Sequence, residues 1–199
     1  MDEFSFLSVL ISVILGLAVT EILQGFRGLL LSRTRIQIYW PVIGWAFLVL
    51  LVCFEYWWSM FRMRTHHDWT FQQFAIMGLQ TTLIYMVAGL VFPDFLGEAI
   101  VDLKESFYAH RRWFFSLAVA IIATSVCKHL LLDGKLPNPT NLVFYGLFGV
   151  TLFIGALTRQ EWYHKTLVVV TNAAFVLYIV LSHVRMRELV QFETRRAAV

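Results

Sequence analysis

The chain has 199 residues, of which 59% are hydrophobic, 16% aromatic and 15% charged, and its mean hydropathy is +0.69. A soluble domain carries about 25% charged residues, so this composition excludes an ordinary soluble globular domain and indicates a membrane protein. The net charge of +3 does not indicate nucleic-acid binding, because the basic residues occur singly or in pairs beside apolar runs, where they anchor helix ends at the lipid headgroups.

Six apolar runs fill nearly all of the sequence, and each is about as long as a helix that crosses a bilayer. In chain order the runs cover residues 4–23, 40–60, 71–92, 113–132, 142–157 and 166–184. Aromatic residues stand at their edges, as is typical of membrane interfaces. The sequence therefore predicts an all-α membrane protein, a six-transmembrane-helix bundle that forms a single integral membrane domain over residues 1–199.

The segment 93–112, between the third and fourth runs, has a different pattern. Phe95, Ala99, Leu103 and Phe107 recur every four residues, while the acidic residues lie elsewhere on the helical wheel. This pattern predicts one short interfacial amphipathic helix. Because its polar face is acidic, we expect it to pack on the rim of the bundle rather than bind anionic lipid.

The orientation in the membrane stays open. With six helices both termini share one side, here called face A, and the opposite side is face B. The 16 Lys and Arg residues divide equally between the two faces, so the positive-inside rule selects neither orientation. Either the C-terminal arginine cluster dominates and both termini are cytoplasmic, or the chain inserts both ways and forms an antiparallel dimer.

Four ionisable residues are expected at similar depth near face A. Glu55 lies about one turn inside the end of the second run, Lys128 and His129 end the fourth, and His183 ends the sixth. Ionisable groups inside a membrane are costly unless they are paired or hydrated, so these residues are candidates for a functional cluster. The alternative is a structural ion pair, or separate side chains that reach the interface.

Other polar residues extend this candidate path. Glu21 and Gln24 lie near the face-B end of the first run, and Gln80 and Asn172 lie inside the third and sixth. They could flank the second mouth and line the space between the two mouths. The alternative for each is a hydrogen bond between helices.

Stripes of small residues predict where helices approach closely, because lipid provides no hydrophobic force between them. The stripes occur on the first, fourth and fifth runs. Their members are Ser8, Ser12, Gly16, Thr20, Ser116, Ala120, Ala123, Cys127, Gly146, Gly149, Gly155 and Ala156.

The sequence contains no recognisable catalytic motif, so an enzyme is not the favoured interpretation. An enzyme acting on lipid or quinone stays open as a third alternative. His66, His67 and Asp68 could bind a divalent metal, but no spaced Cys or His pair follows them. A haem would need facing histidines at one depth, which only His129 and His183 offer. We therefore expect neither a metal nor a cofactor.

Two aromatic motifs, Glu-Tyr-Trp-Trp at 55–58 and His-Arg-Arg-Trp-Phe-Phe at 110–115, together with a short N-terminus, resemble uncharacterised bacterial multi-pass inner-membrane proteins. The resemblance implies a compact multi-pass bundle in the cell inner membrane and carries no activity with it.

The favoured function is a small membrane channel or transporter for an ion, a proton or a small solute. The motive is that charged groups are kept at membrane depth in a chain with little sequence outside the membrane. The alternative is a non-catalytic accessory or scaffolding subunit of a larger membrane complex. The expected partners are membrane lipids and further copies of the chain, and no nucleic acid.

Overall fold

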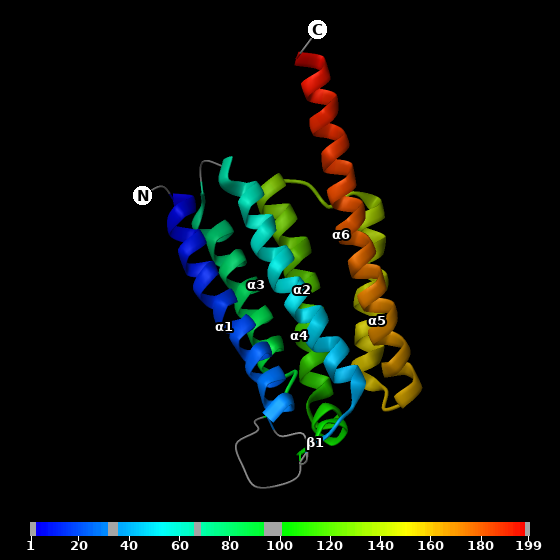
Figure 1. Ribbon diagram of the computed structural model, residues 1–199. Helices are drawn as coiled ribbons and strands as arrows, with labels where there is room; N and C mark the ends of the chain where they lie inside the picture. Colours follow the sequence, from blue (N-terminus) through cyan, green and yellow to red (C-terminus); the bar gives the residue numbers. More distant parts are fainter. Residues whose placement is uncertain (1–2, 32–35, 66–68, 94–100, 198–199) are drawn as a thin grey trace.

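The protein is an all-α bundle, seen here in a computed structural model (Figure 1). The structure describes residues 3–31, 36–65, 69–93 and 101–197, and it describes the backbone alone for residues 3, 61–62, 65, 140 and 181–197. The elements within these ranges are α1 (Glu3–Leu31), β1 (Ile36–Gln37), α2 (Trp40–Arg62), the 3₁₀ turn η1 (Met63–Thr65), α3 (Phe71–Gly89), β2 (Val101–Asp102), α4 (Leu103–Asp133), α5 (Pro139–Leu157) and α6 (Glu161–Ala197).

Four of these helices are long and apolar enough to cross a bilayer. They are Phe4–Leu31, Trp40–Met60, Leu103–Asp133 and Glu161–Val180. Asn141–Leu157 adds a shorter apolar helix. α3 has 19 residues and falls outside both groups, because Gln72, Gln73 and Gln80 lower its hydropathy. The lengths and composition are those of a multi-pass membrane protein.

Local sequence sets the helix ends. Pro41 and Pro139 stand in the first turns of α2 and α5, where a missing N–H costs no helical hydrogen bond. Thr70 and Gln73 form a reciprocal capping box at α3, with N···O distances of 3.3 and 3.0 Å. Gly134 ends α4 in the left-handed conformation, at φ 63°.

The prediction of a separate interfacial helix over 93–112 is wrong for the part that the structure describes, because that part belongs to α4. Residues 94–100 lie outside the described residues, and the part from Leu103 onward forms the first turns of a 31-residue helix that runs to Asp133. Oδ1 of Asp102 accepts hydrogen bonds from the backbone N–H groups of Lys104 and Glu105, at 2.7 and 3.3 Å, and so starts the helix. No Gly or Pro interrupts it before Gly134, so the amphipathic segment and the apolar run are continuous.

All six helices are connected through their packing contacts. α1 packs on α3, α3 on α4 and α4 on α5, while α2 lies against α6 and α1 (Figure 1). α1 begins and α6 ends at the same end of the bundle, which is face A. Near face B, β1 pairs with β2 in parallel, with Ile36 opposite Val101 and Gln37 opposite Asp102.

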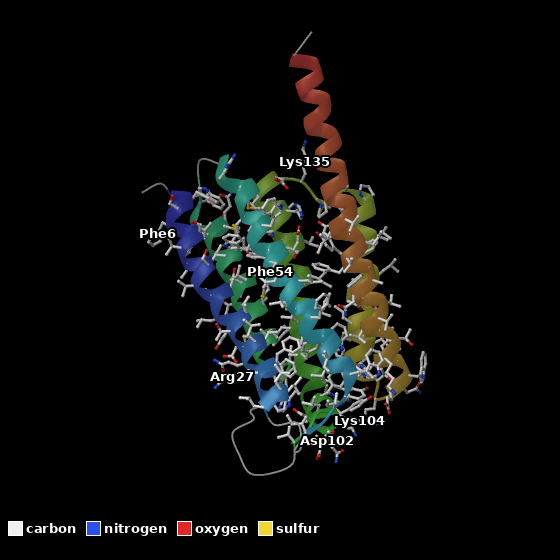
Figure 2. All side chains as sticks on the ribbon, viewed as in Figure 1. Phe6, Arg27, Phe54, Asp102, Lys104 and Lys135 are labelled. Atoms are coloured by element: carbon white, nitrogen blue, oxygen red, sulfur yellow. The ribbon has the colours of Figure 1, made fainter. Side chains whose placement is uncertain are left out.

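Apolar side chains occupy both the core and the outer surface. Phe115, Ile11 and Met77 are among the largest fully buried side chains. Phe6 and Phe54 point outward and are 63% and 55% exposed (Figure 2). A soluble monomer rarely exposes such extensive apolar surface, so lipid is the solvent that fits this exterior.

The small-residue stripes mark close contacts at only some positions. A Cβ added at Gly155 would lie 3.2 Å from Cδ2 of Leu167, as expected for a tight α5–α6 crossing. α2 and α6 also approach closely at Gly44, where an added Cβ would lie 2.7 Å from Cγ2 of Val168. The prediction is wrong where an added Cβ would meet no atom within 4 Å, at Gly16, Gly146 and Gly149. Spacing defines a helical face but not its neighbour, and these faces point outward.

Candidate functional site

The face-A ends of α2 and α4 meet at Tyr56. Nζ of Lys128 lies 5.0 Å from the centre of the Tyr56 ring, a cation–π contact. The Tyr56 hydroxyl donates to the carbonyl oxygen of Met77 on α3, at 3.2 Å. Glu55 precedes Tyr56 on α2 and is half-buried. The structure thus places Lys128 beside the end of α2, in contact with the neighbour of Glu55.

The two histidines expected in the same cluster are placed differently. Nδ1 of His129 lies 3.0 Å from Oδ2 of Asp133, one turn further along α4, so this contact is within one helix. His183 belongs to the part of α6 described by its backbone alone, and its side chain lies outside the described residues. His66, His67 and Asp68 also lie outside them.

The two amides expected along the path both connect helices. Nε2 of Gln80 on α3 donates to Oγ of Ser125 on α4, at 2.6 Å. Nδ2 of Asn172 on α6 donates to the carbonyl oxygen of Gly44 on α2, at 3.1 Å. The donor of each amide is therefore used in helix packing, and the two residues serve different helix pairs.

Glu21 and Gln24 lie on α1, near its face-B end. Glu21 is half-buried and Gln24 is exposed. In the part of the chain that the structure describes, neither side chain forms a hydrogen bond or an ion pair. They stand on a helix that packs on α3, away from the α4–α6 side where the polar groups of face B gather.

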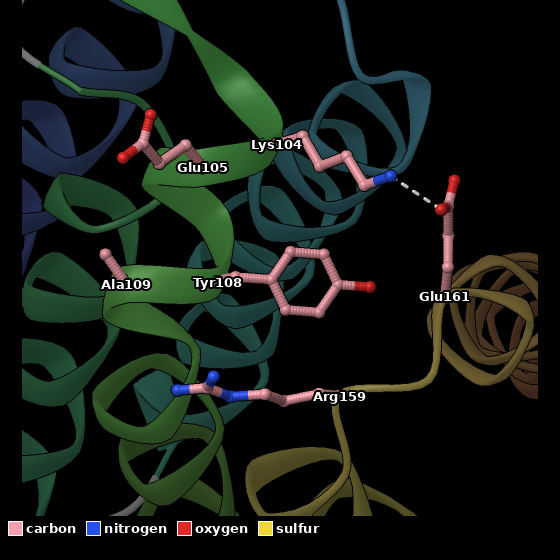
Figure 3. Close-up of a pocket in the computed structure, with 6 residues that line it drawn as sticks. All are labelled: Lys104, Glu105, Tyr108, Ala109, Arg159 and Glu161. Carbon is pink, nitrogen blue, oxygen red and sulfur yellow. Dashed lines mark hydrogen bonds and ion pairs between the residues drawn. The ribbon is translucent and has the colours of Figure 1, made fainter.

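An open cleft with a volume of about 540 Å³ lies between α4 and the start of α6, at the face-B end (Figure 3). We call it the basic pocket; it is lined by Lys104, Glu105, Tyr108, Ala109, Arg159 and Glu161. The Arg159 side chain extends beneath the Tyr108 ring, and the Glu105 carboxylate points away from both. Its lining carries two cations, Lys104 and Arg159, two carboxylates, Glu105 and Glu161, and the hydroxyl of Tyr108.

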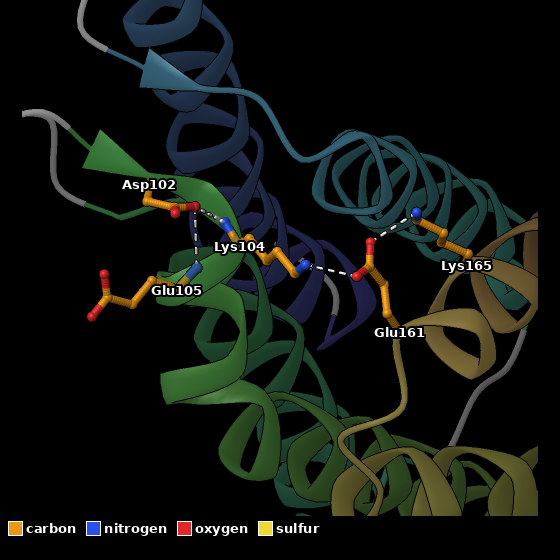
Figure 4. A network of polar contacts seen from close by, with 5 residues as sticks. All are labelled: Asp102, Lys104, Glu105, Glu161 and Lys165. Atoms are coloured by element: carbon orange, nitrogen blue, oxygen red, sulfur yellow. Dashed lines mark hydrogen bonds and ion pairs between the residues drawn. The ribbon is translucent and has the colours of Figure 1, made fainter.

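Ion pairs close one wall of the basic pocket (Figure 4). Nζ of Lys104 lies 2.6 Å from Oε2 of Glu161, and Nζ of Lys165 lies 2.8 Å from Oε1 of the same carboxylate. All three side chains are partly exposed, so these pairs contribute little to stability. Their consequence is electrostatic: because Glu161 is paired with two lysines, its negative charge is already balanced.

Behind the pocket lie two buried polar side chains that the sequence analysis did not single out. Arg111 is 3% exposed and His164 is 0% exposed. Nε of Arg111 and Nε2 of His164 lie 3.1 and 3.2 Å from the carbonyl oxygen of Thr158, and Nη1 of Arg111 donates to that of Tyr108 at 2.9 Å. A carbonyl only accepts, so Nε2 of His164 carries a proton, and Nδ1 is left buried without a partner in the described part of the chain.

A file of unpartnered polar atoms continues from the pocket between α2, α4 and α6. We call it the polar seam; its atoms are the hydroxyls of Tyr39 and Tyr108, Nδ1 of His164, Nε1 of Trp45 and Oδ1 of Asn172. Each is buried and has no hydrogen-bond partner among the residues that the structure describes.

Aromatic rings pack between the atoms of the polar seam. The Tyr108 ring lies 6.3 Å from that of Tyr39 and 5.4 Å from that of His164. The Phe115 ring lies 5.6 Å from His164 and 5.3 Å from Trp45. Asn172 also lies near Trp45, because its Nδ2 donates to the carbonyl oxygen of Gly44, the residue before Trp45.

Arg111 and His164 are both visible in the sequence, but their local patterns favour other interpretations. Arg111 stands in the His-Arg-Arg-Trp motif, where an arginine beside tryptophan is typical of an interface anchor. His164 lies just before the expected sixth run, outside the residues expected at membrane depth. Only the continuity of α4 and the early start of α6, at Glu161, bring both inside the bundle.

Among the described residues, no group of three or more His, Cys, Asp or Glu side chains could hold a metal ion. No family model, curated protein or solved structure matches the chain. What fold and composition define is the class, a multi-pass helical membrane protein. Within that class the chain is distinguished by the basic pocket and the polar seam.

Proposed function

We propose that the protein is a small membrane channel or transporter for an ion, a proton or a small solute. In this proposal all six helices, α3 and α5 included, lie in the cell inner membrane, and copies of the chain associate. The route follows the polar seam between α2, α4 and α6. The face-B mouth is the basic pocket, and the face-A mouth is formed by Glu55, Lys128, His129 and His183.

One observation carries the proposal, namely the buried polar atoms of Trp45, His164 and Asn172 that lack partners in the described structure. A buried donor or acceptor without a partner costs about 1 to 3 kcal/mol, and lipid cannot provide one. Water or a polar solute is the physical means of satisfying them. Three such atoms between the same group of helices favour a hydrated route.

Gln80 is a residue of the same kind that lies outside the proposed route. Its Oε1 is also buried and unpartnered in the described residues, but Gln80 lies between α3 and α4 and binds Ser125. It is therefore outside the proposed route, although it resembles Asn172 in chemistry and burial. Glu21 and Gln24 were expected at the second mouth, and the basic pocket takes that place in the proposal.

Flux into proteoliposomes tests the route. Vesicles containing the purified chain are loaded with dyes for protons, potassium and chloride, and swelling in glycerol reports neutral solutes. We expect Asn172→Leu to lower the flux of the conducted species at least tenfold and Trp45→Phe to lower it measurably. Gln80→Leu is the matched control and should leave flux near the wild-type value. Equal flux in wild type, Asn172→Leu and Trp45→Phe contradicts the proposed route.

The alternative, an accessory or scaffolding subunit, is favoured by a different observation. The amide donors of Gln73, Gln80 and Asn172 all bind a neighbouring helix, as in a protein whose polar groups serve packing. Copurification in a fixed ratio with another membrane protein after mild solubilisation, together with no flux for any tested species, would select this alternative.

A further inference from the structure

We infer that the basic pocket binds a phosphate group, carried by a lipid headgroup or by a soluble phosphate compound. The inference goes beyond conduction, because it concerns what occupies the face-B end of the bundle, whatever passes along the polar seam. Its support comes from charge balance, from an unpartnered hydroxyl and from the position of the cleft.

Charge balance is the first argument. Arg159 lines the pocket and makes no ion pair in the part of the chain that the structure describes. Arg111, just behind it, is buried and, among the residues that the structure describes, binds only the neutral carbonyl oxygens of Thr158 and Tyr108. The positive charges of Arg159 and Arg112 also act on Arg111. Neighbouring guanidinium groups repel one another unless an anion lies between or beside them.

The nearby carboxylates are already engaged or point elsewhere. Glu161 is held by Lys104 and Lys165, at 2.6 and 2.8 Å. The Asp102 carboxylate caps the first turn of α4, and that of Glu105 points away from Arg159 (Figures 3 and 4). The counter-charge for the arginines therefore has to come from outside this group of side chains.

Phosphate fits what the pocket presents. A guanidinium donates two parallel hydrogen bonds to a phosphate, a geometry that a carboxylate or phosphate matches and chloride does not. The Tyr108 hydroxyl, buried and unpartnered in the described residues, lines the same cleft and supplies a further donor. The cleft, at about 540 Å³, has room for a phosphate with a small alcohol attached.

The position of the pocket is the third argument. It lies where α4 and α6 begin, at one end of the bundle (Figure 2). Trp162, 65% exposed, stands beside Glu161, as is typical of a residue at headgroup level. Basic pockets between transmembrane helices at this level are suited to phosphorylated headgroups.

Binding to the purified full-length chain in lauryl maltoside tests the inference, with intrinsic tryptophan fluorescence as the readout. The probes are dioleoylphosphatidylglycerol, inorganic phosphate and glycerol phosphate, and oleate serves as an anionic lipid without phosphate. We expect Arg159→Gln to weaken binding of the phosphate probe about tenfold and Tyr108→Phe to weaken it about fivefold. Arg159→Lys, which keeps the charge, should lose less than Arg159→Gln.

Arg27→Gln is the matched control, because Arg27 is an exposed arginine on α1 at the same face and outside the pocket. Its affinity should equal that of wild type. If Arg159→Gln melts at a lower temperature than wild type, Tyr108→Phe carries the test, since it keeps the ring and removes only the hydroxyl.

The probes separate the two sources. Binding of the phospholipid alone identifies a headgroup, and binding of glycerol phosphate or inorganic phosphate identifies a soluble ligand; both outcomes support the inference. It is overturned if no phosphate probe binds, if oleate binds equally well, or if Arg159→Gln and Tyr108→Phe bind as tightly as wild type. A chain that conducts nothing could still bind phosphate, so failure of the flux experiment leaves this result intact.

Discussion

Arg111 and His164 donate hydrogen bonds to the same acceptor, the carbonyl oxygen of Thr158, at 3.1 and 3.2 Å. Arg111 belongs to α4 and His164 to α6, while Thr158 is the C-cap residue that follows α5. One carbonyl oxygen thus connects three helices at the face-B end. Both donor side chains are buried.

Removing the Arg111 side chain tests this connection. Arg111→Gln should lower the free energy of unfolding by about 2 kcal/mol, because hydrogen bonds from a charged donor are lost and two carbonyl oxygens lose a donor. Unfolding by sodium dodecyl sulfate in mixed micelles measures the change. Arg112→Gln is the control, since Arg112 is the exposed neighbour in sequence and should change little. Equal effects of the two substitutions would contradict the connection.

The α2–α6 contact can be tested at Gly44. Gly44→Ala should destabilise the protein by about 1 to 3 kcal/mol, because its Cβ would overlap the branched side chain of Val168. Gly146→Ala meets open space and should be neutral or stabilise by up to about 1 kcal/mol, since alanine favours the helix. The comparison uses the same unfolding measurement. If Gly146→Ala costs as much as Gly44→Ala, the crossing is placed wrongly.

The hydrogen bond between Gln80 and Ser125 should contribute little to the free energy of unfolding, although its N···O distance is only 2.6 Å. Bonds between transmembrane helices average about 0.6 kcal/mol, because the unfolded chain also finds partners. A double-mutant cycle with Gln80→Leu and Ser125→Ala should give a coupling free energy of this size. A coupling above about 2 kcal/mol would show that this bond is a main tie between α3 and α4.

Tyr39, at the start of α2, gives the stability of the protein a pH dependence. Burial, with a smaller contribution from Tyr108, raises the pKa of the Tyr39 phenol well above its usual value. The contribution of neutral Tyr39 is complete below about pH 10, where the unfolded chain also keeps its proton, and is lost as pH rises above that value. Melting temperatures between pH 8 and pH 11 should fall less steeply in Tyr39→Phe than in wild type. Identical slopes would show that Tyr39 titrates normally.

The helices themselves were largely predictable from sequence. Apolar runs, Pro41 and Pro139 at helix starts, and Gly134 after a helix all act locally, so one sequence reveals them. The prediction of a separate interfacial helix over 93–112 was wrong from Leu103 onward, because an amphipathic and a fully apolar pattern can belong to one helix. Charge content describes the environment of a segment and does not say where its hydrogen bonding stops.

The site was less predictable, for a physical reason. Depth along a helix follows from residue number, so the sequence could predict that Lys128 and Glu55 lie at similar depth. Which helices are neighbours does not follow, and Arg111 and His164 become important only because α4 and α6 meet near Thr158. Asn172 and Gln80 were expected along one path, yet they lie at different helix pairs. Helix adjacency is a property of the whole packing.

The unbroken course of α4 has a mechanical consequence. At 1.5 Å per residue its 31 residues make a rod of about 46 Å, with Lys104 and Tyr108 near one tip and Lys128 near the other. Without a glycine or proline hinge, tilting one tip must displace its opposite tip. We therefore expect a displacement of the start of α4 beside Arg159 to shift Lys128 against the Tyr56 ring at the other end of the bundle.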